Sequence, residues 1–260
     1  MADRDVIVDI DGRVASIKLN KPEVKNAMGK QTLHGILDAL DRIDKDPGIG
    51  VVIITGAGDS FCSGLDTREV ASPTAEGGDE FTKMTDRVFG RVENFHKITI
   101  AVVRGYCMAG GFELAMGCDF IIADEKSRIG DGHIKLAGLV PNGGASNRLP
   151  KLIGTKKAKL MLYTGDLISG KEAEKIGLVD FAVPADEVDD TTRKLVSRLT
   201  DKSPIGLAYM KKLIHASSRC TFEEGLELEH DAVRLLAATE DHHEAVRAFK
   251  EKRQPVFTGK

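Results

Sequence analysis

The sequence predicts an α/β fold whose second half is almost entirely helical. In the first half, short runs of β-branched residues alternate with a segment whose apolar residues recur every three or four positions. After Gly143 the helical spacing dominates, and only residues 179–183 interrupt it as a strand. A chain of 260 residues can bury one large core, so one large domain, with at most a small appendage, is expected.

The first elements are a hairpin and a helix. Residues 6–10 and 14–19 are rich in β-branched side chains and flank an Asp-Gly turn, which is typical of an antiparallel hairpin. Residues 30–46 carry apolar side chains at helical spacing, and an Asp-Pro-Gly sequence ends the pattern. The chain is therefore expected to turn back once before its first helix.

Three apolar runs come next, at residues 51–55, 99–103 and 120–123. Consecutive side chains of a strand point to opposite faces of the sheet, so an unbroken apolar run indicates a strand that is covered on both faces. Residues 67–80, between the first two runs, contain Gly and Pro and few large apolar side chains, so a surface loop is predicted there.

Helices are predicted in the second half at residues 156–164, 170–176, 185–199, 204–216, 222–239 and 242–252. We place a boundary before Pro204, because the sequence beyond it offers no further strand for a helix to cover. Residues 1–203 are thus predicted as the core, and residues 204–260 as a helical C-terminal region.

Composition excludes several classes of protein. Lys+Arg 37 against Asp+Glu 40 gives a net charge of -3 without a long basic run, so no nucleic-acid partner is expected. No apolar run approaches the roughly 20 residues that span a bilayer. The cysteines contain no Cys-x-x-Cys pair, so no metal site is expected and a reducing cytosol fits. The apolar run near the start is too short for a signal peptide, and a cytoplasmic protein is expected.

Two glycine-bearing segments come after predicted strands without matching a nucleotide site. Residues 56–61 lack the third glycine of a dinucleotide motif, and residues 105–110 lack the Lys-Ser/Thr of a P-loop. The segment after Gly110 is compatible with a helix, so the amides there would lie at a helix N-terminus. Two such loops side by side could form a two-amide oxyanion hole, or the glycines could simply permit tight packing.

Four segments carry a resemblance to a known family. They are NKPEVKNAM (20–28), FCSGLD (61–66), GYCMAGGFEL (105–114) and GLVPNGG (138–144), in this order. Smaller marks lie at residues 148–150, 165–183 and 248–257. Together they resemble the crotonase (enoyl-CoA hydratase/isomerase) superfamily. The set is specific for the superfamily and less specific for the reaction.

The resemblance implies a crotonase-like spiral of ββα repeats and a C-terminal helical region that packs across a homotrimer, often doubled to a hexamer. It implies an acyl-CoA thioester as substrate, with no cofactor beyond the CoA that belongs to the substrate. By matching positions, the amides of Leu65 and Gly110 would form the oxyanion hole, and Glu113 would be one of two catalytic glutamates. The bland alternative for Glu113 is an acidic residue favoured in a first helical turn by the helix dipole.

The second glutamate of the family is missing, because the matching segment reads IGDGHI (129–134). Three interpretations remain open. His133 could act as the second acid or base, since histidine titrates near neutral pH. Asp131 could turn in instead, because Gly132 stands where the family has proline and loosens the turn. In the third, neither acts and His133 only lines the pocket.

The same resemblance implies smaller roles for other residues. Lys25 and the carbonyls around Cys62 and Ser63 match the regions that contact CoA, while an exposed loop lysine is the alternative for Lys25. Asp66 is expected either to cap its turn or to touch the substrate. Phe257 is expected at the CoA site of a neighbouring subunit.

The first functional hypothesis is an enoyl-CoA hydratase, or dehydratase, that acts through an oxyanion-stabilised enolate. A Δ3,Δ2-enoyl-CoA isomerase is the alternative, because it needs only one base. Thioester hydrolysis, decarboxylation and C–C cleavage are further alternatives, because these crotonase reactions use the same oxyanion hole. A non-catalytic CoA- or RNA-binding relative is the remote alternative, against which Glu113 and the net negative charge argue.

Overall fold

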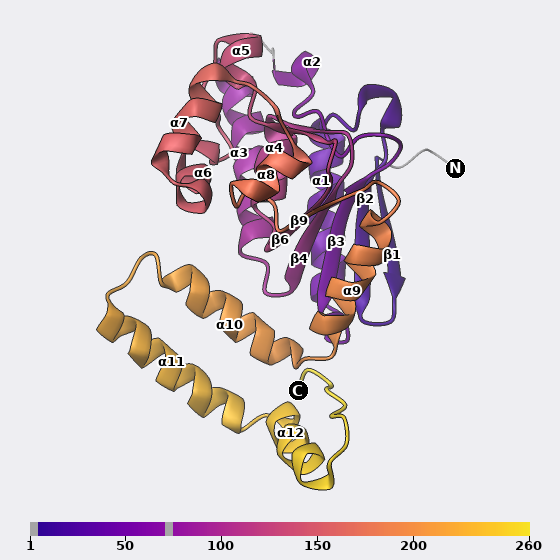
Figure 1. Ribbon diagram of the computed structural model, residues 1–260, viewed down its shortest axis with the longest axis vertical. Coiled ribbons are helices and arrows are strands. Elements are labelled where there is room, and N and C mark those ends of the chain that lie inside the picture. The colour runs from indigo at the N-terminus through magenta and orange to yellow at the C-terminus, as the bar shows by residue number, and fades with distance from the viewer. Residues whose placement is uncertain (1–4, 71–74) are drawn as a thin grey trace.

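The computed structural model of the chain describes residues 5–70 and 75–260, apart from the side chains of residues 70–79. Within these residues, the centre is a six-stranded sheet in the order β1-β2-β3-β4-β6-β9 (Figure 1). The β1-β2 hairpin is antiparallel, and every other neighbouring pair is parallel. The strands are β1 (Val6–Asp11), β2 (Val14–Leu19), β3 (Val51–Gly56), β4 (Ile98–Val103), β6 (Phe120–Asp124) and β9 (Phe181–Val183).

A second, smaller sheet continues the turns of the first. Strand β5 (Tyr106–Met108) lies parallel to β7 (Arg128–Gly130), which pairs with β8 (Ile168–Ser169). Cys107 of β5 also pairs in parallel with Cys62, just beyond the loop after β3. Successive turns of the chain therefore stack in the same direction, as the expected spiral requires.

Helices cover both faces of the large sheet, as predicted. On one face, side chains of α1 (Lys30–Asp44), α3 (Ala75–Glu93) and α4 (Gly110–Met116) share a core with Val52 and Ile54. On the other face, α9 (Val188–Thr200) packs against Val51 and Ile100. The remaining helices of the body are η1 (Pro22–Val24), α2 (Thr67–Val70), α5 (His133–Ala137), α6 (Ala145–Ile153), α7 (Thr155–Thr164) and α8 (Gly170–Lys175).

The predicted hairpin, buried strands and later helices are confirmed to within a few residues, but the predicted loop at 67–80 is wrong. Helix α2 occupies its first four positions and α3 begins at Ala75, while residues 71–74 lie outside the described residues. The glycines near 77 lie in the first turn of a long helix. Burial of Phe81, Val88 and Phe89 further along α3 favours the helix despite them.

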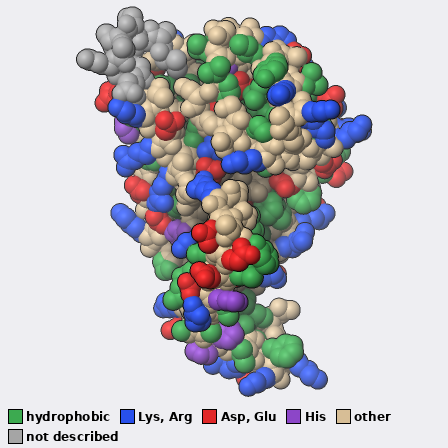
Figure 2. All heavy atoms as spheres, turned by 90° about the vertical axis from the view of Figure 1, so that its left-hand side faces the viewer, with side chains coloured by type: hydrophobic (Ala, Val, Ile, Leu, Met, Phe, Trp, Pro, Cys, Tyr) green, Lys and Arg blue, Asp and Glu red, His purple; other side chains and the backbone are tan. Residues whose placement is uncertain are grey.

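Three helices project from the body: α10 (Pro204–Ala216), α11 (Phe222–Ala237) and α12 (Glu240–Glu251). They form the narrow lower part of the molecule in Figure 2, where hydrophobic side chains reach the surface. Val233 of α11 is 65% exposed and Phe249 of α12 is 86% exposed. Within the described residues, no helix is long and apolar enough to cross a membrane.

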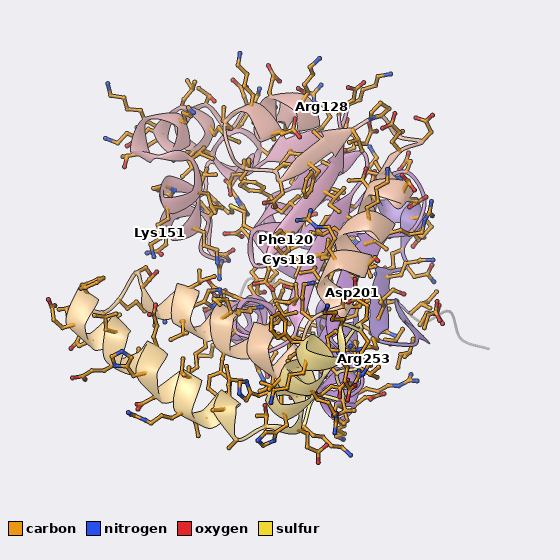
Figure 3. The ribbon with its side chains drawn as sticks, turned by 60° about the horizontal axis from the view of Figure 1, so that its bottom comes forward. Cys118, Phe120, Arg128, Lys151, Asp201 and Arg253 are labelled. Atoms are coloured by element: carbon orange, nitrogen blue, oxygen red, sulfur yellow. The ribbon has the colours of Figure 1, made fainter. Side chains whose placement is uncertain are left out.

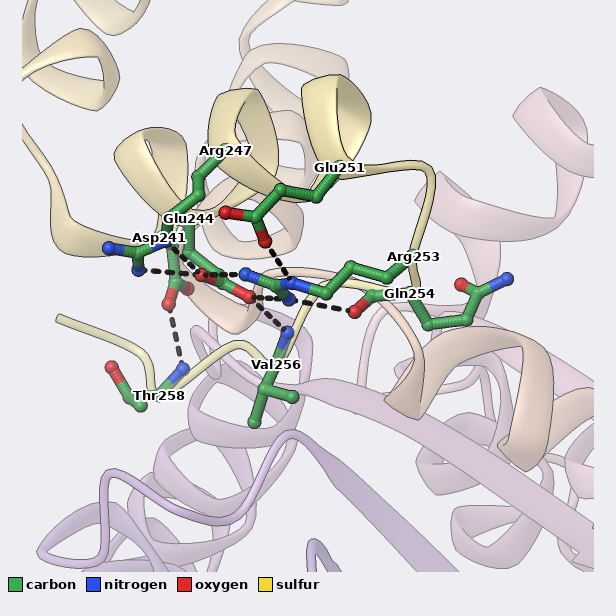
Figure 4. Close-up of polar contacts among 8 residues, drawn as sticks. All are labelled: Asp241, Glu244, Arg247, Glu251, Arg253, Gln254, Val256 and Thr258. Atoms are coloured by element: carbon green, nitrogen blue, oxygen red, sulfur yellow. Dashed lines mark hydrogen bonds and ion pairs between the residues drawn. The ribbon is translucent and has the colours of Figure 1, made fainter.

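The end of the chain folds back onto α12 (Figure 4). Glu244 accepts hydrogen bonds from the Arg253 and Arg247 side chains and from the Val256 amide at 3.0 Å. Asp241 accepts the Thr258 amide at 2.7 Å. The two arginines and the Val256 amide hold the pKa of Glu244 far below its usual range, so the carboxylate stays charged. The tail that carries Phe257 is therefore fixed against α12.

Candidate active site

Glu113, in the first turn of α4, is fully buried. Its Oε1 accepts the amide of Gly143 at 2.7 Å and the amide of Ala145 at 3.1 Å. Its Oε2 is buried and has no hydrogen-bond partner among the described residues. Burial raises the pKa of the carboxyl above its ordinary value, although the two amides oppose the shift. One oxygen is thus fixed while the other is available to carry a proton.

The loop behind Glu113 leaves no room for a side chain at Gly143. A Cβ there would lie 2.4 Å from the Phe89 ring and 2.6 Å from Oε2 of Glu113. The loop can therefore approach the carboxylate closely only because this residue is glycine. The sequence alone predicted no role for Gly143 or Ala145 at the site, although the paired glycines of the GLVPNGG segment were a usable signal.

Asp131 and His133 form a pair at the start of α5. Nδ1 of His133 lies 3.0 Å from each carboxylate oxygen of Asp131, and the His133 amide donates to Oδ1 at 3.1 Å. Because a carboxylate only accepts, Nδ1 carries the proton. The hydrogen bond to Asp131 raises the pKa of His133, and the charge of Glu113 raises it further. The protonation of His133 therefore depends on both Asp131 and Glu113.

The backbones of Leu65 and Gly110 lie side by side. A Cβ added to Gly110 would lie 3.0 Å from Cγ and 3.4 Å from the amide nitrogen of Leu65. Gly110 begins α4, so its amide has no acceptor inside the helix. Among the described residues, none accepts the Leu65 amide either. Two free N–H groups from different loops are thus neighbours.

Ala109, just before Gly110, has φ +50° and ψ −126°, a backbone conformation that residues other than glycine rarely adopt. Such strain costs about 1–3 kcal/mol and persists only where the surroundings enforce it. Here the Ala109 amide donates to the carbonyls of Gly130 and Asp131, at 3.2 and 2.9 Å. The contact ties the Gly110 loop to the Asp131–His133 loop.

The residues expected to contact CoA lie beside this loop. Lys25 is exposed, with Nζ 4.0 Å from the centroid of the Tyr106 ring, and its carbonyl accepts the Ser63 amide at 2.9 Å. The hydroxyl of Ser63 donates to the Val24 carbonyl at 3.2 Å. Cys62 is buried, and burial raises the pKa of its thiol to about 12. The Cys62 carbonyl accepts an amide from the neighbouring strand, so this residue also fixes the loop.

Asp66 caps the turn at the start of α2. Its carboxylate accepts the backbone amide of Arg68 at 3.0 Å and the Arg68 guanidinium at 2.6 Å. The guanidinium lowers the pKa of Asp66 to about 2. Of the two roles expected for Asp66, the cap is present.

Phe257 is not brought to Glu113 within one chain. Its neighbours Val256 and Thr258 are hydrogen-bonded to α12, and Figure 1 shows α4 and α5 at the other end of the molecule from α12. Within residues 5–70 and 75–260, no group of three or more His, Cys, Asp or Glu side chains is placed so that it could hold a metal ion.

Stacked ββα turns, two adjacent free amides and a buried glutamate after the second of them define a protein of the crotonase type. The family model for enoyl-CoA hydratase/isomerase matches residues 9–260. The chain therefore belongs to the enoyl-CoA hydratase/isomerase family and is an enzyme of that type.

Relatives match over the full length. The chain is 35% identical over 261 residues to a crotonyl-CoA hydratase of Syntrophomonas wolfei, with 100% of each chain covered. It is 33% identical to a 2,3-dehydroadipyl-CoA hydratase of Escherichia coli, covering 98% of this chain and 99% of the relative. The crystal structure of an enoyl-CoA hydratase from Bacillus anthracis superposes with a TM-score of 0.94 at 33% identity, over 98% of this chain and 100% of that one.

Proposed function

We propose that the protein hydrates α,β-unsaturated acyl-CoA thioesters, or catalyses the reverse dehydration. One observation carries the proposal: a buried carboxylate has one oxygen fixed by two amides and the other unpartnered, and it interacts with a histidine that an aspartate holds. Hydration needs two proton-transferring groups around one water, and this arrangement supplies them. The names of the relatives support the same reaction.

In the proposed mechanism, the amides of Leu65 and Gly110 bind the thioester carbonyl. Ionised Glu113 takes a proton from a water molecule while the oxygen of that water attacks the β-carbon. The electrons of the double bond move to the carbonyl oxygen, which gives an enolate. Each amide stabilises that charge by about 3–4 kcal/mol. Protonated His133, held by Asp131, then delivers a proton to the α-carbon. The sum is one water added across the double bond.

Isomerisation of a Δ3 to a Δ2 double bond is the second candidate. The observation that favours it is the absence of a second glutamate in residues 129–134, since an isomerase needs only one base. In that reaction Glu113 alone would carry a proton from one carbon to the other, and His133 would line the pocket.

Incubation with a panel of enoyl-CoA thioesters in heavy water, followed by mass spectrometry, separates the candidates. Gain of one water in the product supports hydration. Deuterium exchange without that gain supports isomerisation. Neither change with any Δ2 or Δ3 substrate would contradict both, and would favour hydrolysis, decarboxylation or C–C cleavage.

We further propose that the active form is a homotrimer or hexamer in the cytoplasm. The exposed apolar side chains of the helical region 204–260 support association, since the body formed by residues 1–203 leaves them uncovered. In such an assembly Phe257 would contact the CoA of a neighbouring subunit, next to that subunit's Lys25, Cys62 and Ser63. The free thiols fit a reducing compartment. CoA enters as part of the substrate, and no further cofactor is proposed.

A further inference from the structure

A chain of contacts connects Glu113 to α3 through Arg148 on α6. The Arg148 guanidinium donates through Nη1 to the Gly143 carbonyl and through Nη2 to Oε2 of Glu93, the latter at 2.7 Å. The amide of the same Gly143 donates to Oε1 of Glu113 at 2.7 Å. Arg148 therefore bonds directly to the residue that holds Glu113.

Arg148 is packed tightly against this loop. Its side chain is only 15% exposed, and its Nε is buried without an acceptor among the described residues. A Cβ on Gly144 would lie 2.5 Å from Nη1 of Arg148, and the φ of +99° at Gly144 also favours glycine. The loop that carries the Gly143 and Ala145 amides is thus held on one side by the guanidinium.

Glu93 anchors the guanidinium. The ion pair with Arg148 lowers the pKa of Glu93, so its carboxylate is charged at neutral pH. Removal of one partner from such a shielded pair would leave the other poorly solvated. The pair also borders a cavity of about 890 Å³ between the body and α10, which Lys151, Cys118 and Phe120 help to line (Figure 3).

A purely structural role would require only the Glu93–Arg148 pair, which joins α3 to α6. The additional bond from Arg148 goes to the carbonyl of the one residue whose amide is closest to Glu113. We propose that Arg148, anchored by Glu93, is a positioning residue that aims the Gly143 and Ala145 amides at the Glu113 carboxylate. This rests on the role of Glu113 in the proposed function.

Arg148→Met tests the proposal, with Lys151→Met as matched control. Both remove one positive charge from α6 beside the same cavity, but within the described part of the chain the Lys151 side chain hydrogen-bonds only to Asn147, at 2.9 Å. Arg148→Met should lower kcat about 10–100-fold, the cost of a misplaced catalytic group, with KM within a few fold. The acid limb of the kcat profile should move to higher pH, because a carboxylate that loses donors ionises less readily. Arg148→Lys should restore part of kcat, and Lys151→Met should change neither quantity.

A loss of kcat with an unmoved acid limb would show that Arg148 only stabilises the fold, and would overturn the proposal. So would an unchanged kcat. A second readout does not depend on turnover: the infrared band of protonated Glu113, identified by its loss in Glu113→Gln. This band should persist to higher pH in Arg148→Met than in the parent protein.

The infrared readout separates the two proposals. If the protein hydrates no enoyl-CoA but the band shifts, the positioning role stands and the proposed reaction fails. If Arg148→Met does not fold, Glu93→Gln loosens the anchor while keeping the guanidinium, and it should shift the band in the same direction by less. An unshifted band in the folded variant would overturn the positioning role.

Discussion

The imidazole Nδ1 of His133 lies 3.0 Å from both carboxylate oxygens of Asp131. From the sequence, these residues were alternative substitutes for a missing glutamate. In the structure they form one unit, because Asp131 orients the ring and stabilises its charged form. Because both carboxylate oxygens of Asp131 are engaged with Nδ1 of His133, we propose the imidazole as the group that exchanges a proton with substrate.

His133→Ala should lower the hydration rate by about 10²–10⁴, the usual scale for loss of a general acid or base. Exchange of the substrate α-proton with solvent deuterium should fall to a similar extent, because His133 delivers the α-proton in the proposed mechanism. Stopped assays of hydration and deuterium incorporation on the same samples measure the two losses. Exchange that persists in the variant, or no loss of either activity, would contradict the two-group mechanism and favour the isomerase.

Asp131→Asn should move the alkaline limb of the kcat profile to lower pH. The aspartate raises the pKa of His133, so without its charge His133 loses its proton at lower pH. Activity that depends on protonated His133 then disappears earlier as pH rises. A pH–rate profile at saturating substrate measures the limb, and an unmoved limb would exclude His133 as the acid.

Gly110→Val should reduce kcat by at least about 10²–10³, the cost of one lost oxyanion donor. The new side chain would enter the space beside the Leu65 amide but meet mainly the flexible Leu65 side chain, so the fold should survive. Gly90→Ala is the control, because nothing lies within 4 Å of its Cβ. Circular dichroism checks the fold of each variant, and normal turnover by Gly110→Val would exclude this pair of amides.

Glu113→Gln should abolish hydration while acyl-CoA affinity stays within a few fold. The amide side chain keeps the shape and loses only proton transfer. Isothermal titration with a substrate analogue and a rate assay measure the two quantities. Retained turnover would remove Glu113 from the mechanism.

The same variant should be more stable than the parent at neutral pH, and the difference should grow with pH. Burial raises the pKa of Glu113 above its unfolded value, so its contribution to stability is complete below about pH 4.5 and is lost as pH rises through the folded pKa. Gln has no such loss. Melting temperatures of both proteins from about pH 4 to about pH 8 measure the difference, and a constant difference would contradict the shifted pKa.

The sequence by itself determined the features that depend on neighbouring residues. The apolar runs at β3, β4 and β6 and the spacing in α1 predicted these elements, because burial of a strand or a helix face requires that local pattern. The resemblance placed Leu65, Gly110 and Glu113, and the structure brings the first two together.

Only the tertiary structure decided how Glu113 is held and how His133 and Asp131 relate. The Glu113–Gly143 hydrogen bond joins residues 30 positions apart, and Arg148 reaches Glu93 across 55 positions. No local periodicity encodes such bonds, because they depend on which loops the packing of α3, α4 and α6 brings together. For the same reason the sequence could not place Phe257: polar contacts of the tail to Asp241 and Glu244, rather than any pattern around Phe257, fix it far from Glu113 of its own chain.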